Sequence, residues 1–294
     1  MTLTPFLLSV HRRRVLLAAA ALAMAPAAGA SPAPGPLIRR GDRLFLAAKI
    51  NGVGVEGLLD SAAETSLLSP ALATRLSLGA GDQAQAHGSG ASAMTARLVP
   101  HVRIAAAGVE VADATVAVID LADVSRRLVG RPIDLVVGRE IFDAARLFVD
   151  IGGGTIGPLA PAAPPKGVEL PLIEERGLML LPVSVEGGAP VSAEFDLGNG
   201  TGVILSRRFA RQAGLLDGRP VTTALGGGLG GAKPRQSIVL KRLSLAGRSF
   251  ANLRADVDDA PDAHDANIGV GVLQHFRITT DFAHKKLWLE AVQP

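Results

Sequence analysis

Short apolar runs separated by turn-forming residues follow one another along the first half of the chain. Residues 44–60 form two apolar runs on either side of Asn51-Gly52, a pair that favours a two-residue hairpin turn. Further apolar runs at residues 99–104, 109–119, 133–138 and 147–151 predict strands. A short helix is predicted after Ser69-Pro70, because serine caps helices and proline tolerates their first position. The pattern therefore predicts a β-rich fold with little helix.

The same order of elements returns in the second half. Residues 180–195 read as a second hairpin, and Ser206 is expected to cap a helix that ends at Gly214. Strands are predicted at 238–245, 250–257, 277–281 and 286–289. This repetition predicts two equivalent lobes. The predicted divisions are a signal peptide at 1–30, an N-terminal spacer at 31–42, a first lobe at 43–157, a Pro-rich linker at 158–170 and a second lobe at 171–294.

Each predicted lobe places an aspartate directly after an apolar strand. Asp60-Ser61-Ala62-Ala63 follows the first hairpin, and Asp196-Leu197-Gly198-Asn199 follows the second. An apolar pair ending in glycine comes later in each lobe, as Val136-Val137-Gly138 and Val270-Gly271. Two carboxylates at the tips of equivalent strands can be brought together, and such a pair shares a proton.

This arrangement resembles the bacterial retropepsin-like aspartyl proteases, in a tandem form like a small two-lobed pepsin. The resemblance covers about residues 43–157 and 171–291. It implies an all-β acid-protease fold with one β-barrel-like lobe per repeat. It also implies that Asp60 and Asp196 form a catalytic dyad that activates water to hydrolyse peptide bonds. The apolar-glycine strands would then brace the two aspartate loops.

The resemblance also assigns supporting and substrate-binding residues. Glycine-rich tips suit flaps that close over an extended peptide and exclude water. The residues expected to support the dyad are Ser61, Ala62, Leu197, Gly198 and Asn199. Those expected in the flaps are His87, Gly88, Ser89, Gly90, Gly226, Gly227 and Gly228.

Two positions depart from the family pattern. Leu197 stands where a hydroxyl is usual, and Ala62 stands where glycine is usual. Only Ser61 can then hydrogen-bond between the loops, and its expected partner is backbone of the Asp196 loop. We therefore predict a slow exported aspartic-type endopeptidase with an intact fold. Two alternatives stay open: a catalytically weak or inactive peptide-binding relative, and a structural β protein of the cell envelope.

The N-terminus predicts export to the periplasm or outside the cell. Arg12–Arg14 precede an apolar run at 15–24, and Ala28-Gly29-Ala30 suits cleavage. That run is too short to span a bilayer, so no stable membrane anchor is expected after removal. General secretion and twin-arginine export both stay open. Residues 1–30 hold three of the 30 Lys and Arg and none of the 27 Asp and Glu. The remaining chain is neutral, so nucleic acid is not an expected partner.

Other chemistry finds little support in the residue pattern. The chain contains no Cys, and its histidines, expected on the surface, lack metal-site spacing, so no metal or cofactor is expected. The glycine run at 226–231 is followed by Ala232-Lys233-Pro234, which cannot begin the helix that a dinucleotide site needs. The aspartates between 256 and 265 are expected in a solvated turn, and Asp150 and Asp281 are expected to cap turns. The expected partner is a peptide or protein substrate, bound by a monomer that holds both lobes.

Overall fold

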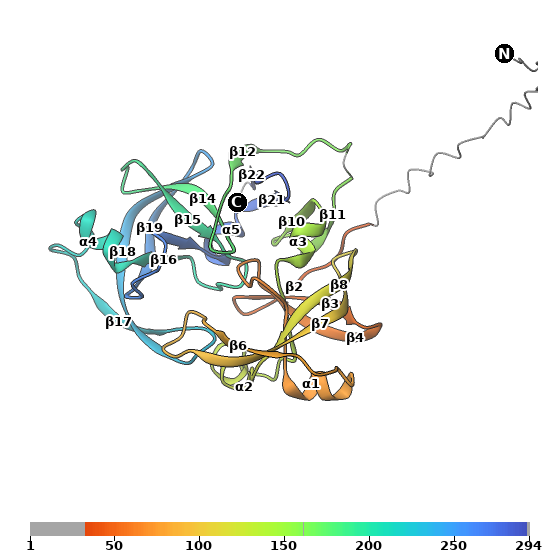
Figure 1. Cartoon of the computed structure of the whole chain (residues 1–294). Helices are drawn as coiled ribbons and strands as arrows, with labels where there is room; N and C mark the ends of the chain where they lie inside the picture. Colours follow the sequence, from red (N-terminus) through yellow and green to blue (C-terminus); the bar gives the residue numbers. More distant parts are fainter. Residues whose placement is uncertain (1–32, 161, 293–294) are drawn as a thin grey trace, which may run out of the picture. The chain divides into compact units, whose positions relative to one another are not determined.

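The computed structural model describes residues 33–160 and 162–292, and they are mostly β-strand (Figure 1). The predicted signal peptide lies outside these residues. None of the helices in the described ranges has the length and hydropathy needed to cross a membrane. The all-β prediction is confirmed, and the strands form three sheets in this part of the chain.

The first lobe is built on an eight-stranded sheet. The predicted hairpin is confirmed, and Asn51 and Gly52 both adopt positive φ at its turn. Within the sheet β4 runs parallel to β9, and β5 runs parallel to β8. In spatial order the described strands are β2 (Ile38–Arg40), β3 (Arg43–Ile50), β4 (Val53–Leu59), β9 (Leu135–Val137), β5 (Leu67–Leu68), β8 (Val109–Val118), β7 (Met94–Ala106) and β6 (Asp82–Ala86).

The second lobe repeats this sheet strand for strand. Its two parallel pairs, β15 with β20 and β16 with β19, occupy the positions equivalent to those of the first sheet. The predicted repetition of elements therefore corresponds to two copies of one sheet. In spatial order the described strands are β13 (Ile173–Glu175), β14 (Leu178–Val185), β15 (Pro190–Phe195), β20 (Ala266–Ile268), β16 (Val203–Ser206), β19 (Arg248–Asp258), β18 (Lys233–Leu245) and β17 (Thr222–Gly226).

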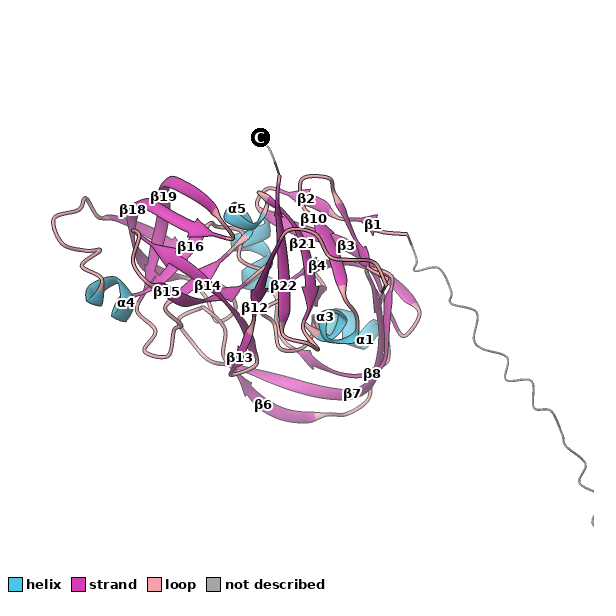
Figure 2. Ribbon diagram, turned by 90° about the horizontal axis from the view of Figure 1, so that it is seen from above, coloured by secondary structure: helices cyan, strands magenta, loops and turns pink. Residues whose placement is uncertain are grey.

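A six-stranded sheet joins the two lobes, and Figure 2 shows it between them. Its central pair is antiparallel: β10 comes from the first half of the chain and β21 from the second. Strands β1 and β12 fall in stretches that the sequence assigns to the spacer and the linker. In order the described strands are β1 (Gly35–Pro36), β11 (Thr155–Pro158), β10 (Leu147–Asp150), β21 (Phe276–Asp281), β22 (Lys286–Ala291) and β12 (Val168–Pro171).

The helices are short, and the predicted caps are confirmed. Ser69 Oγ accepts from Leu72 N at 3.0 Å, and Ser206 Oγ accepts from Phe209 N at 3.1 Å. These bonds satisfy amide groups that the first helical turn leaves free. The helical segments described are α1 (Pro70–Arg75), α2 (Ala122–Val124), the π-helical η1 (Ser125–Val129), α3 (Glu140–Ala144), α4 (Arg207–Gln212) and α5 (Val270–Leu273).

One predicted equivalence is wrong. Val270 and Gly271 do not brace the second aspartate loop as a strand, because helix α5 begins at Val270. The bracing strand is β20, whose last residue Ile268 accepts from Asp196 N at 3.1 Å. In the first lobe Val137 O accepts from Asp60 N in the same way, at 3.0 Å. Gly269, rather than Gly271, is therefore the counterpart of Gly138.

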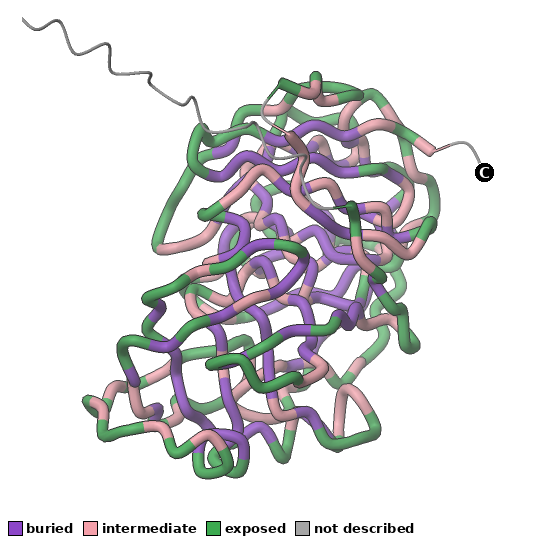
Figure 3. Tube along the Cα trace, turned by 90° about the vertical axis from the view of Figure 1, so that its right-hand side faces the viewer, coloured by how far each residue is buried: buried purple, intermediate pink, exposed green. Residues whose placement is uncertain are grey.

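Both lobes and the joining sheet share a core made mainly of Val, Leu, Ile and Ala. Phe282, beside β21, stacks on Phe142 of α3 with ring centroids 5.3 Å apart and meets Phe195 of β15 edge-on at 6.1 Å. Buried positions follow the inner strands of each sheet, and exposed positions gather at the turns (Figure 3). The continuous core fixes the strands that carry Asp60 and Asp196 relative to each other.

Candidate active site

The two aspartates occupy equivalent places, one directly after β4 and the other directly after β15. Each carboxylate is held by its own loop, because one of its oxygens accepts two backbone N–H groups. Asp60 Oδ1 accepts from Ala62 N at 2.9 Å and Ala63 N at 3.1 Å. Asp196 Oδ1 accepts from Gly198 N and Asn199 N, both at 2.9 Å.

The two loops are in direct contact. Ser61 Oγ donates to Phe195 O at 3.0 Å and accepts from Leu197 N at 2.9 Å. This confirms the expectation that the Ser61 hydroxyl bonds to backbone of the Asp196 loop. A Cβ on Gly198 would lie 2.2 Å from Asp60 Cγ, so only glycine allows this approach. The carboxyl of one loop therefore packs against the backbone of the other.

The departures from the family pattern have different structural consequences. The Leu197 side chain is fully buried in the main core, so it packs instead of hydrogen-bonding across the junction. Ala62 is not among the described residues with positive φ, and its Cβ therefore adds no backbone strain. The link between the loops rests on one hydroxyl, that of Ser61, where the family pattern has two.

The two carboxyls influence each other's ionisation. Burial, and next the charge of Asp196, raises the pKa of Asp60 to about 7 against the lowering effect of its backbone hydrogen bonds. Burial also raises the pKa of Asp196, against hydrogen bonds from Asn267 and its own loop. Neighbouring carboxylates in a partly buried site cannot easily both ionise, so the pair holds a shared proton near neutral pH.

Arg43 is a residue that sequence reasoning missed. It begins β3, and its guanidinium donates to the carbonyl oxygen of Gly198 in the other lobe. Its positive charge lowers the pKa of both Asp60 and Asp196. In the sequence it follows other arginines before an apolar strand, so nothing distinguished it from a solvated residue. Its positive charge partly offsets the electrostatic repulsion between the two carboxyls.

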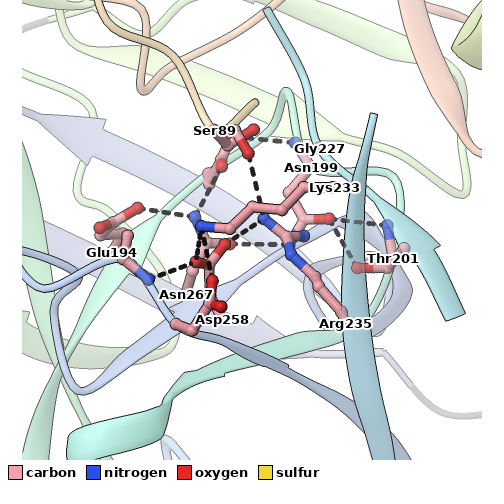
Figure 4. A network of polar contacts seen from close by, with 12 residues as sticks. Ser89, Glu194, Asn199, Thr201, Gly227, Lys233, Arg235, Asp258 and Asn267 are labelled. Carbon is pink, nitrogen blue, oxygen red and sulfur yellow. Dashed lines mark hydrogen bonds and ion pairs between the residues drawn. The ribbon is translucent and has the colours of Figure 1, made fainter. Parts of the chain in front are cut away.

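A second carboxyl lies beside Asp196, and the sequence did not reveal it either. Asn267 Nδ2 donates to Asp196 Oδ2 and to Glu194 Oε2, both at 2.7 Å. Asn267 Oδ1 accepts from Asn199 Nδ2 at 2.7 Å, which ties in a residue predicted to support the dyad (Figure 4). Burial, and next the charge of Asp196, raises the pKa of Glu194 to about 7. The available signal was an acid at a strand position where the first lobe has Leu58.

The predicted flap loops lie at the β6–β7 and β17–β18 turns, and their tips meet. Gly90 N donates to Leu229 O at 2.9 Å, and Ser92 N donates to Gly230 O at 3.0 Å. A Cβ on Gly228 would lie 2.5 Å from Ser89 Oγ, and one on Gly88 would lie 2.7 Å from Leu229 O. The glycines therefore allow two backbones to approach closely.

Two arginines hold the second of these tips. Arg127 of η1 donates to the carbonyl oxygens of Gly227 and Gly228, both at 2.7 Å. Gly226 packs on Arg235, because a Cβ there would lie 2.7 Å from Arg235 Cδ. His87 is exposed beside these contacts. A pocket of about 260 Å³ lies at the meeting tips, lined by residues that include Met94, Val124 and Leu229.

The acidic stretch between 256 and 265 is more structured than predicted. Asp256 and Asp258 are buried, so the expected solvated turn is wrong for these two. Asp258 accepts from Lys233 Nζ at 2.7 Å and from Arg235, and Asp256 accepts from the Ser237 hydroxyl. Within the described ranges no cluster of His, Asp or Glu could hold a metal ion.

Of the remaining predictions, those for the two turn-capping aspartates are confirmed, and the one for His264 is wrong. Asp150 Oδ1 accepts from Gly153 N at 2.7 Å, and Asp281 Oδ1 accepts from His284 N at 3.2 Å, which confirms both as turn caps. His264 is buried next to the Arg176 guanidinium, so the predicted surface position is wrong for it.

Comparison with known proteins agrees with this geometry. Residues 46–141, which include Asp60 and β9, match the family model described as aspartyl protease. This match supports a place in the aspartyl protease family, and the fold of the described residues is all-β with two large sheets. Among solved structures it is similar to a retropepsin-like aspartic protease from Rickettsia conorii, at 20% identity over 42% of this chain and 93% of that one, with a TM-score of 0.32. A comparison with curated proteins finds no match.

Proposed function

We propose that this chain is an aspartic-type endopeptidase whose catalytic dyad is Asp60 and Asp196. The observation that carries the proposal is the junction of the two loops. Ser61 bridges them, and Gly198 lets the Asp60 carboxyl pack on the opposite backbone. Equivalent strands in two lobes therefore deliver two carboxyls to one place, each oriented by two N–H groups of its own loop.

The chemistry follows from the shared proton. The ionised carboxyl takes a proton from a water lying between the two, and the protonated carboxyl donates to the carbonyl oxygen of the scissile peptide bond. Because the titration belongs to the pair, either carboxyl can hold the proton at the start of a cycle. Arg43 stabilises the singly ionised pair, since its charge lowers the pKa of both acids.

The flaps supply substrate contacts. The tips of the β6–β7 and β17–β18 turns are hydrogen-bonded to each other, so a peptide must enter while they are parted and be covered when they meet. Backbone groups at the glycines of both tips can pair with an extended peptide without specific side chains. Ser89, Gly90, Gly227 and Gly228 are the residues we expect to contact it.

The test is cleavage of a complex peptide mixture by the purified chain, read by mass spectrometry. Asp60→Asn and Asp196→Asn should each abolish cleavage and leave the melting temperature at or above that of the natural chain. Asp113→Asn, which removes an exposed carboxylate on the first lobe, should cleave normally. Cleavage that survives in both dyad variants would show that the dyad is not the catalyst.

Peptide binding without hydrolysis is a second candidate function. Two observations favour it: Leu197 removes one of the hydroxyls between the loops, and Arg127 pins a flap tip. Calorimetric binding of peptides by the natural chain, with no cleavage over days, would support this alternative. Binding and turnover together would support the endopeptidase.

We also propose that the protein is exported and acts as a monomer. Arg12–Arg14, the apolar run at 15–24 and Ala28-Gly29-Ala30 support removal of the first 30 residues. The presence of both aspartate loops in one chain supports a monomer. N-terminal sequencing should find a mature chain that starts near Ser31, and light scattering should give one copy. An intact Met1 in the cytoplasm would count against export.

A further inference from the structure

The faces of the two lobes that lie beside the dyad have opposite chemistry. In the first lobe Leu58 of β4, two residues before Asp60, pairs with Val136 of β9. At the equivalent places of the second lobe, Glu194 of β15 pairs with Asn267 of β20. Strand residues alternate between faces, so both pairs point away from the main core that holds Leu59 and Phe195. One pair is apolar, and the other carries a carboxyl and an amide.

The contrast extends to the neighbouring strands. Ala117 of β8 and Ala96 of β7 belong to the small apolar cluster around Leu58, to which Leu229 of the second flap also packs. In the second lobe, Asp256 of β19 and Arg235 of β18 stand at the positions equivalent to these two alanines. Ala117 is paired with a residue of β5, and Asp256 is paired in the same way with a residue of β16. Figure 4 shows the polar group, with Glu194, Asn267, Asp258, Lys233 and Arg235 gathered together.

Most charges in the polar group are already balanced. Asp258 is paired with Lys233 at 2.7 Å and also with Arg235. Lys233 lies 2.9 Å from Asp259 as well, and Asp256 lies 3.4 Å from Arg254. Three cations therefore meet three carboxylates in this group. Glu194 has no ion pair among the described residues.

Glu194 keeps a free hydrogen-bonding oxygen. Its Oε2 accepts from Asn267, and in the described ranges no donor reaches its Oε1. Because the same Asn267 nitrogen reaches Asp196 Oδ2, the Glu194 carboxyl lies immediately beside the dyad. A carboxyl that is partly buried, singly bonded and without an ion pair either stays protonated or needs a cation when it ionises.

We propose that Glu194 is a specificity-determining residue, and that the face of the second lobe beside Asp196 binds a lysine or arginine side chain of the substrate next to the scissile bond. The first lobe's side, lined by Leu58 and its apolar neighbours, takes an apolar side chain. This inference rests on the proposed peptidase function, because it assigns the substrate class of the same site. The chemical class of the preferred substrate is a peptide with one basic and one apolar residue flanking the bond.

The test measures binding, so that it does not depend on turnover. Peptides in which a hydroxyethylene isostere replaces the scissile bond cannot be cleaved. The two members of each pair of such peptides would differ at one residue flanking the isostere, which is lysine in one member and norleucine in the other. The natural chain should bind one lysine peptide about tenfold more tightly than its norleucine partner, the size expected for a hydrogen bond to a charged group. Calorimetry at low salt measures both affinities.

Variants assign the preference to the carboxyl. Glu194→Leu introduces the residue that the first lobe has at the equivalent position, Leu58, and it should reverse the preference toward norleucine. Glu194→Gln keeps the shape and should remove the preference, and it decides the question if the leucine variant misfolds. Glu110→Gln, an exposed acid of β8, is the matched control and should behave as the natural chain. Equal binding of both peptides by the natural chain, or a lysine preference that survives Glu194→Gln, would overturn the inference.

The pH dependence gives an independent readout. Burial and the charges of Asp196 and Asp258 raise the pKa of Glu194 to about 7, against the lowering effects of the Asn267 hydrogen bond and the charge of Arg176. The lysine preference should therefore grow between pH 5 and pH 8 as this carboxyl ionises, and a preference that is constant over this range would contradict the assignment. Failure of the peptidase itself is recognised separately, by a natural chain that cleaves no peptide in the mixture.

Discussion

Replacing Ser61 by alanine removes the one hydroxyl that links the aspartate loops. Ser61 is 3% exposed, and it holds Phe195 O and Leu197 N from across the junction. Alanine leaves the Leu197 N–H buried without this acceptor and takes the donor from Phe195 O. An unsatisfied buried group costs about 1–3 kcal/mol, so we expect a loss of about 2–4 kcal/mol in the free energy of unfolding.

The loss should appear in both stability and turnover. For a protein of this size it corresponds to a fall of about 5–10 °C in melting temperature, measured by calorimetry. A shift of about 1 Å between the carboxyls can cost roughly a hundredfold in rate, so kcat should fall by about that factor while KM changes little. Cleavage of a fluorogenic peptide identified from the mixture measures kcat and KM.

Two matched variants separate this effect from general damage. Ser61→Thr keeps a hydroxyl at the junction and should retain most activity. Thr74→Val removes an exposed helix hydroxyl that bonds Pro70 O, and it should change the melting temperature by less than about 2 °C. If Ser61→Ala melts and cleaves as the natural chain does, the loops are held by packing alone, and the reasoning about the junction is refuted.

Three further outcomes are expected. Glu194→Gln should raise the melting temperature at pH 8 and leave it unchanged at pH 4. A carboxyl whose pKa is raised to about 7 in the folded state stabilises the fold at low pH and loses that contribution as pH rises through 7. A rise in melting temperature at both pH values would contradict the assignment. Arg127→Met should free the second flap tip, and amide hydrogen exchange at residues 227–231 should become faster. Arg126→Met is the control. Unchanged exchange would show that the contacts between the two tips are enough to hold the second tip in place. Leu197→Thr places a hydroxyl in a fully buried site, so it should lower the melting temperature by several degrees. A higher kcat in the same variant would show that the new hydroxyl links the loops.

Local features of the chain were readable from the sequence because each depends on neighbouring residues. Asn51-Gly52 fixes a hairpin turn by itself, and the serines before α1 and α4 cap their helices whatever surrounds them. The repeated order of strand, aspartate loop and capped helix also survives into the structure. The two aspartate loops could therefore be located, and so could the contact made by Ser61.

The position of the brace in the second lobe shows where this reasoning fails. Val270-Gly271 and Ile268-Gly269 both read as an apolar residue followed by glycine. Only the pairing of β20 with β15 selects Ile268, and helix α5 then begins at the residue that the sequence assigned to the strand. A local sequence pattern holds no information on pairing with a strand 73 residues away, as between Phe195 and Ile268, so it cannot distinguish the two.

The chemistry around the two aspartates depended even more on tertiary structure. Arg43, Glu194 and Asn267 are single polar residues in apolar or basic stretches, and they matter because three separate strands bring them to the dyad. Asp256 and Asp258 look solvated in the sequence, but the register of β18 against β19 places them opposite Ser237 and Arg235. The sequence alone thus determined the two lobes and the two aspartates. Long-range strand register decided which charges surround them, because a charge is buried or solvated according to its partners across the sheet.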